Sequence, residues 1–159
     1  MRGSAPPSSS GASLQARALR WLANREHSRQ ELRAKLLRAA EGDDAAAQVD
    51  ALLDQLAAHG WLNERRFVES RVHARQARFG DRRIESELRA HGLTLDATDA
   101  AQLRASELAR AREVWRKKFG QRASDAAGHA KQVRFLSARG FSPEVVHKVV
   151  SGDQDTESI

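Results

Sequence analysis

The chain has 159 residues, which limits it to one or two small domains. Although 40% of the residues are hydrophobic, 28 of these are alanine, and Leu, Ile, Val and Phe together number only 32. This composition argues against a large hydrophobic core and favours a helical protein with a small one. Lys and Arg total 27 against 21 acidic residues, and 22 of the 27 are arginine. The resulting charge of +6 favours polyanions or acidic protein surfaces as partners.

Several protein classes are excluded by what the sequence lacks. It contains no cysteine, which excludes disulfides, thiolate metal sites and cysteine nucleophiles. No apolar run approaches 18 residues, so we expect no membrane partner. Residues 1–13 read MRGSAPPSSSGAS, without the apolar core of a signal peptide, and we expect them to be disordered. We therefore expect a soluble cytoplasmic protein that is a monomer.

The first half of the chain predicts a series of helices. No proline occurs between Pro7 and Pro143, and the intervening sequence is rich in Ala, Leu, Arg, Glu and Gln. The first helix is expected over 14–24. Ser28, three residues before Glu31, forms a capping-box pattern that starts the second. The starts of the next three helices are expected at Asp43-Asp44, at Asn63 (running to about Phe79) and at Asp81.

The second half continues in the same way. A sixth helix is expected from Thr94 or Asp96, and a helix around Trp115, over roughly 103–119, either follows or continues it. Ser124 is expected to cap the next helix. Ser142 precedes Pro143 at the start of the last one, as is typical of a first-turn proline. The chain is therefore predicted to be all-α.

Three of these helices end in the same pattern, with a Leu four residues before a Gly and a large apolar residue after it. This spacing predicts a Schellman cap, in which the glycine takes a left-handed conformation. The three segments are Leu56 to Trp61, Leu88 to Leu93 and Leu136 to Phe141.

A weak internal period accompanies the helices. Leu32 and Leu36 align with Ile84 and Leu88 at a spacing of 52, and Leu88 aligns with Leu136 at 48. A period near 50 with about three helices indicates tandem helical units. We place the units at 14–62, 63–103 and 104–150, with a flexible acidic tail at 151–159.

The sequence offers little for catalysis. It has neither a phosphate-binding glycine loop nor a nucleophile motif, so we expect no enzyme activity and no cofactor. Glu69 and His73 lie four residues apart, but no further ligand joins them, and we expect no metal site. The three tryptophans could stack on nucleic-acid bases, but we expect all of them to lie in the hydrophobic core. They are Trp21, Trp61 and Trp115.

Basic residues gather in three runs, along successive units. Each run alone is equally well explained as a solvated helix face, whereas three together favour a basic ridge that contacts phosphates or carboxylates. The candidate partner-binding residues are Arg25, Arg29, Arg66, Arg71, Arg75, Arg78, Arg82, Arg83, Arg116 and Lys117.

Four segments together resemble the RecX family, regulators of the RecA recombinase. They are Trp21 to Leu36, Leu52 to Phe67, Arg78 to Gly92 and Arg134 to Ser142. The likeness extends from about Leu14 to Val150. It departs from the family where Ala40-Glu41-Gly42 replaces a tight glycine turn.

The resemblance implies three tandem three-helix repeats in an elongated, curved molecule. It further implies a non-enzymatic protein that enters the groove of the RecA–DNA filament and lowers ATPase, strand-exchange and coprotease activities. Such a protein would regulate DNA repair, recombination and the SOS response, with DNA as a further contact. The alternative is a stand-alone DNA-binding protein built from helix-turn-helix-like units.

Overall fold

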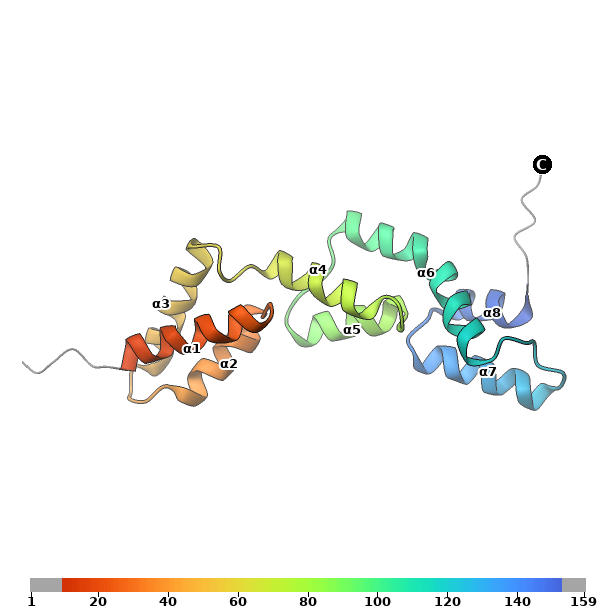
Figure 1. Ribbon diagram of the computed structural model, residues 1–159, viewed down its shortest axis with the longest axis horizontal. Helices are drawn as coiled ribbons and strands as arrows, with labels where there is room; N and C mark the ends of the chain where they lie inside the picture. Colours follow the sequence, from red (N-terminus) through yellow and green to blue (C-terminus); the bar gives the residue numbers. More distant parts are fainter. Residues whose placement is uncertain (1–9, 153–159) are drawn as a thin grey trace, which may run out of the picture. The chain divides into compact units, whose positions relative to one another are not determined.

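The computed structural model describes residues 10–152, and this part of the chain is helical with no strand (Figure 1). The all-α prediction is confirmed. Two compact units divide between Ser70 and Arg71. The helices are α1 (Ser10–Asn24), α2 (Arg29–Ala39), α3 (Ala45–Ala58), α4 (Glu64–Arg75), α5 (Asp81–Ala90), α6 (Ala97–Lys118), α7 (Ala126–Ala138) and α8 (Pro143–Ser151).

The two ends of the chain were expected to be irregular. Residues 1–9 and 153–159 lie outside the described residues, so the prediction for them stands as a prediction. Within the described part, α1 begins at Ser10, four residues earlier than the expected start at Leu14, and α8 includes Ser151.

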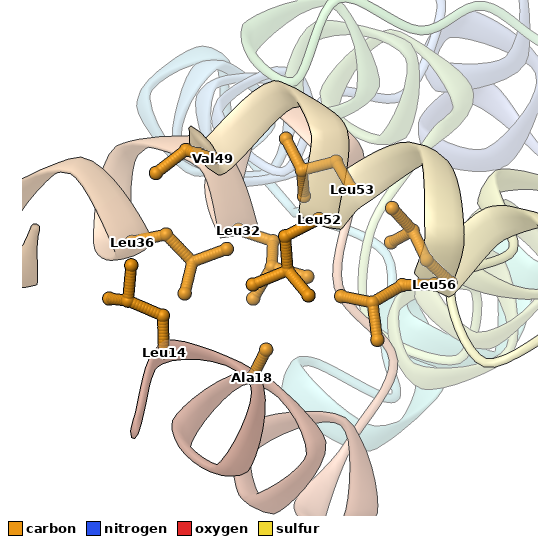
Figure 2. Packing of buried hydrophobic residues seen from close by; sticks show 9 residues of the cluster. Leu14, Ala18, Leu32, Leu36, Val49, Leu52, Leu53 and Leu56 are labelled. Atoms are coloured by element: carbon orange, nitrogen blue, oxygen red, sulfur yellow. The ribbon is translucent and has the colours of Figure 1, made fainter. Parts of the chain in front are cut away.

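The first unit is built on a leucine core between α1, α2 and α3. Figure 2 shows side chains of all three helices pointing toward one another. Each helix contributes residues at intervals of three or four, because this spacing lines up one face of a helix. The buried residues of this cluster are Leu14, Ala18, Leu32, Leu36, Val49, Leu52, Leu53, Leu56 and Leu62.

Two polar side chains cap helix starts in the first unit as the sequence predicts. Ser28 Oγ accepts a hydrogen bond from the Glu31 amide at 3.1 Å. Asn63 Oδ1 accepts one from the Arg66 amide at 3.0 Å. Asp44 is the N-cap of α3, but its carboxylate accepts from the Gln48 side chain instead of a backbone amide. The predicted helix starts are therefore confirmed at these positions.

The second unit is organised around α6. This helix is continuous over 22 residues, so the helix around Trp115 continues the one capped by Asp96. Its C-terminal part packs with α7 and α8 over a second apolar cluster. The buried residues of that cluster are Ala111, Val114, Leu136, Phe141, Val146, Val149 and Val150.

Three local predictions were wrong. Helix α4 ends at Arg75, and a turn follows it as far as Phe79. Helix α7 is capped by Asp125 and not by Ser124, because the Asp125 carboxylate accepts the Gly128 amide at 2.7 Å. Trp61 is 44% exposed and stacks on His59 with ring centroids 4.7 Å apart, so it is no core residue. The other two tryptophans are half-buried against the apolar clusters.

The three predicted Schellman caps are confirmed. Gly60, Gly92 and Gly140 have φ of 76°, 73° and 86°, in the left-handed region. In each case the amide after the glycine reaches back to the predicted leucine carbonyl, at 2.9 to 3.3 Å. The apolar residue after Gly140 is Phe141, which is buried in the core of the second unit.

Candidate functional site

A single aromatic ring in the second unit is surrounded by arginines. The guanidinium carbons of four arginines lie 4.9 to 5.7 Å from the centroid of Phe79. Cations at this range are attracted to the face of an aromatic ring. We call these residues the Phe79 cluster, which consists of Phe79, Arg75, Arg78, Arg83 and Arg139.

One carboxylate, that of Glu87 on α5, serves three arginines at this place. Arg83 Nε donates to Glu87 Oε1 at 3.2 Å. Arg75 Nε lies 3.1 Å and Arg71 Nη1 lies 4.0 Å from Glu87 Oε2. Arg75 Nε and Glu87 Oε2 are both buried, yet neither has a well-directed hydrogen bond. Glu87 therefore balances only part of the positive charge gathered here.

A second aromatic group extends the basic surface. Arg139 lies over Phe135 as well as Phe79, at 5.0 Å from the Phe135 centroid. Lys118, at the end of α6, lies over Phe135 at 5.5 Å, and Phe119 meets the same ring edge-on. Residues from α6 and α7 thus join those of α4 and α5 on one surface of the second unit.

Arg110 on α6 fixes the turn that carries Phe79. Its Nη1 donates to the carbonyl oxygens of Gln76 at 3.0 Å and Phe79 at 2.8 Å. Its Nη2 donates to the Asp81 carboxylate, and its Nε donates to Ser106 Oγ at 2.9 Å. The turn after α4 is therefore tied to α6 by a guanidinium that has several partners at once.

Glu107, one turn before Arg110 on α6, joins two further helix starts. Its side chain is only 2% exposed. Oε2 accepts the Asp81 amide at 3.1 Å, and Oε1 accepts both the Ser142 amide at 2.9 Å and the Ser142 hydroxyl. Glu107 thus holds the N-termini of α5 and α8, where helix dipoles favour a negative charge. Ser142 is the predicted N-cap of α8, but its hydroxyl serves Glu107 rather than a backbone amide.

Two buried carboxyl groups meet in this network. Burial, and then the neighbouring Glu107, raise the pKa of Asp81 to about 7 against the opposing effect of Arg110. Burial would also raise the pKa of Glu107, but hydrogen bonds from Ser142 and Asp81 outweigh it and place that pKa below its ordinary value. Glu107 is therefore the carboxylate of the pair, and Asp81 is the group that holds a proton most readily.

This pKa predicts how stability depends on pH. Between pH 4 and pH 7 folded Asp81 retains a proton that the unfolded chain releases, so its contribution to stability falls as the pH rises. We expect the free energy of unfolding of the wild type, minus that of Asp81→Asn, to decrease from pH 5 to pH 8. The slope should reach at most about 1.4 kcal/mol per pH unit. Urea titrations at several pH values measure it, and a constant difference would contradict the prediction.

The wild type must be compared with Asp81→Asn because another buried group makes the free energy of unfolding change with pH in the opposite direction. Burial lowers the pKa of His27, whose Nδ1 lies 3.0 Å from the Arg25 carbonyl oxygen. A histidine with a lowered pKa gains stability as the pH rises. This contribution is common to the wild type and Asp81→Asn, so it cancels in the subtraction.

The ten basic residues predicted from the sequence fall into both units, and most have acidic partners. In the first unit, Arg25, Arg29 and Arg66 pair with Glu31, Asp54 and Glu26. In the second, Arg71, Arg75 and Arg83 share Glu87, while Arg116 and Lys117 share Glu113. Within the described chain, Arg78 and Arg82 have no acidic partner. Of these two, Arg78 lies over Phe79, so the Phe79 cluster contains a guanidinium that no acidic side chain of the described chain neutralises.

Sequence reasoning missed three members of this surface. Arg139 lies 60 residues from Phe79 in the chain, and only the fold brings the two together. From the sequence, Phe79 was expected only to end the fourth helix, and Lys118 was not among the predicted basic residues. Neither Arg139 nor Lys118 carries a local pattern that indicates an aromatic partner. A count of arginines next to phenylalanines would have pointed to Arg66, Arg78 and Arg134, and so to neither Arg139 nor Lys118.

Comparison with protein families decides which proteins this chain resembles. Three family models match it in order: RecX, first three-helix domain, over residues 16–49; RecX, second three-helix domain, over 63–101; and RecX, third three-helix domain, over 105–150. The chain belongs to the RecX family. The resemblance noted in the sequence is thereby confirmed, as is an all-α fold with three RecX three-helix domains.

Individual RecX proteins agree with this assignment. The regulatory protein RecX of Herminiimonas arsenicoxydans is 52% identical over 148 residues, which cover 91% of this chain and 95% of the relative. That of Chromobacterium violaceum is 41% identical, covering 92% and 95%. The crystal structure of RecX from Lactobacillus salivarius matches with a TM-score of 0.69 at 16% identity, covering 92% and 97%. The fold of this structure is therefore the RecX fold, and its relatives' names support a regulatory role.

Among the helices between residues 10 and 152, none is both long and apolar enough to cross a bilayer.

Proposed function

We propose that this RecX-family chain is a non-enzymatic regulator that binds the RecA–DNA filament in the cytoplasm. There it inhibits the ATPase, recombinase and coprotease activities of RecA, and so regulates recombination and DNA repair. Family membership supports the regulatory role. We choose the surface around Phe79 as the contact surface because four arginines surround this ring. Their positive charge suits an acidic partner.

Binding through such a surface relies on many weak polar contacts. The ten predicted basic residues are mostly exposed or half-buried, and most hold an intramolecular acidic partner that a RecA contact would have to replace. Exposed ion pairs of this kind each contribute little to stability, so exchanging partners costs little. Electrostatic attraction then mainly accelerates and orients docking on the filament.

Charge reversal tests the proposed surface. We expect the double variant Arg78→Glu/Arg82→Glu to raise the concentration needed for half-maximal inhibition of RecA ATPase at least tenfold. These two positions are chosen because they lack acidic partners, whereas Glu at positions 71 and 75 would face Glu87 and disturb the fold. The assay uses RecA, ATP and single-stranded DNA with substoichiometric amounts of this chain. Inhibition equal to that of the wild type would remove this surface from the interface.

The same assay separates inhibition from simple DNA binding. Full-length protein is also titrated against free duplex and single-stranded DNA over a series of salt concentrations. Inhibition of RecA at concentrations where free DNA is unbound is the expected result. Tight, sequence-selective binding to free duplex without an effect on RecA would instead identify a stand-alone DNA-binding protein.

A further inference from the structure

The Phe79 cluster holds more positive charge than its own fold requires. Four guanidinium groups approach one ring, and each such contact contributes only weakly to stability at an exposed site. Their mutual repulsion opposes this gain. A cluster of this kind is stabilised when an anion lies among the guanidinium groups.

Glu87 is the anion that the structure places there, and it fits imperfectly. The Glu87 carboxylate oxygens lie 4.0, 3.1 and 3.2 Å from the nearest guanidinium nitrogens of Arg71, Arg75 and Arg83. The contact with Arg75 is an ion pair without a directed hydrogen bond. Since planar arginines bind carboxylates best through two parallel hydrogen bonds, a better-oriented carboxylate would be held more strongly than Glu87.

We propose that the Phe79 cluster is a binding site for carboxylate side chains of an acidic protein segment, and that Glu87 is its internal competitor. The partner's carboxylate takes the place of Glu87 among the arginines and also engages Arg78 and Arg139, which Glu87 does not reach. This inference rests on the proposed function, in which the acidic segment belongs to RecA.

A carboxylate is favoured over a nucleic acid by two observations. The resident anion is itself a carboxylate. Moreover, Phe79 is only half-buried, but its ring is surrounded by guanidinium groups from Arg75, Arg78, Arg83 and Arg139, which leaves a base little room to stack on it.

The test is binding of a fluorescein-labelled octaglutamate peptide to the full chain, followed by anisotropy at low salt. Glu87→Gln removes the competitor, and we expect it to bind the peptide at least threefold more tightly than the wild type. Glu113→Gln is the matched control, because Glu113 also neutralises two basic residues, Arg116 and Lys117, and the net charge changes equally. We expect the control to strengthen peptide binding by much less than Glu87→Gln does.

Equal strengthening by both substitutions would reduce the effect to net charge and overturn the proposal, as would weaker binding by Glu87→Gln. Stronger binding of Glu87→Gln to labelled oligothymidine than to the peptide would overturn the carboxylate assignment. Arg78→Gln provides a variant that leaves the ion pairs of Glu87 intact. It should weaken peptide binding at least threefold, and unchanged binding would also overturn the proposal.

The RecA assay keeps this inference separate from the proposed function. Peptide binding with the expected variant effects, but no inhibition of RecA ATPase, would reject RecA as the target and retain the carboxylate site. Inhibition of RecA with no effect of Glu87→Gln or Arg78→Gln on peptide binding would reject the site and retain the function.

Discussion

Replacing Gly140 with alanine is expected to destabilise the second unit by about 4 kcal/mol, because the substitution carries two costs. Its φ of 86° is left-handed, which an L side chain rarely adopts. A Cβ atom at this position would also lie 2.4 Å from the Cβ and 2.6 Å from the amide nitrogen of Arg83. Backbone atoms cannot move aside as the end of a flexible side chain can.

Two other glycines separate these costs. Gly60 has φ of 76° with nothing within 4 Å of an added Cβ, so Gly60→Ala should cost only about 1 kcal/mol. Gly80 has φ of −81°, but its Cβ would lie 2.3 Å from the Phe141 amide nitrogen, and Gly80→Ala should cost about 3 kcal/mol. Urea denaturation measures all three variants. A Gly140→Ala variant no less stable than Gly60→Ala would show that the close backbone contact is absent.

Glu107→Gln is the second substitution with a large expected effect, about 3 kcal/mol. The two oxygens of Glu107 accept three hydrogen bonds, from the Asp81 amide, the Ser142 amide and the Ser142 hydroxyl. A glutamine supplies one acceptor oxygen and an NH2 group, which would face at least one buried donor. The starts of α5 and α8 both lose their shared anion, so both helix ends should loosen.

The measurement needs a probe confined to the second unit. Trp115 is the tryptophan of that unit, and its Nε1 donates to Gln132 Oε1 at 2.9 Å. In a Trp21→Phe/Trp61→Phe background, the fluorescence of Trp115 therefore follows unfolding of this unit. Glu113→Gln, on an exposed face of α6, is the control and should unfold like its parent. A Glu107→Gln variant within 0.5 kcal/mol of its parent would contradict the role of Glu107 as a shared cap.

Much of the fold could be predicted because its determinants are local. The helix-starting residues Ser28 and Asn63 act within one turn, and so do the glycines that end helices. Errors arose where two neighbouring residues competed for the same role, as at Ser124 and Asp125. The exposure of Trp61 was also missed, since a Schellman cap fixes the backbone after the glycine but does not decide whether that residue is covered.

The candidate site could be predicted only in part. The arginine runs near Phe79 are visible in the sequence, whereas their pairing with Glu87 depends on how α4 meets α5. Arg139 joins the site because the turn before α8 lies against the start of α5, where the Gly80 amide donates to the Arg139 carbonyl at 2.9 Å. Such long-range contacts leave no periodic signal. The buried pair of Asp81 and Glu107 was equally hidden, because acidic residues on helices are ordinarily solvated.

The uninterrupted α6 has a consequence for how length changes are tolerated. An inserted residue advances a helix by about 100° and 1.5 Å. Glu107 and Arg110 bind the start of α5, while Ala111 and Val114 pack with α8. All four residues lie on α6. One residue added between Arg110 and Ala111 would turn the α7–α8 pair by more than a quarter of a revolution about the α6 axis relative to α5. The number of residues in α6 between its α5 contacts and its α8 contacts therefore decides whether Arg139 lies beside Phe79. Point substitutions on the exposed face of α6 do not change this number.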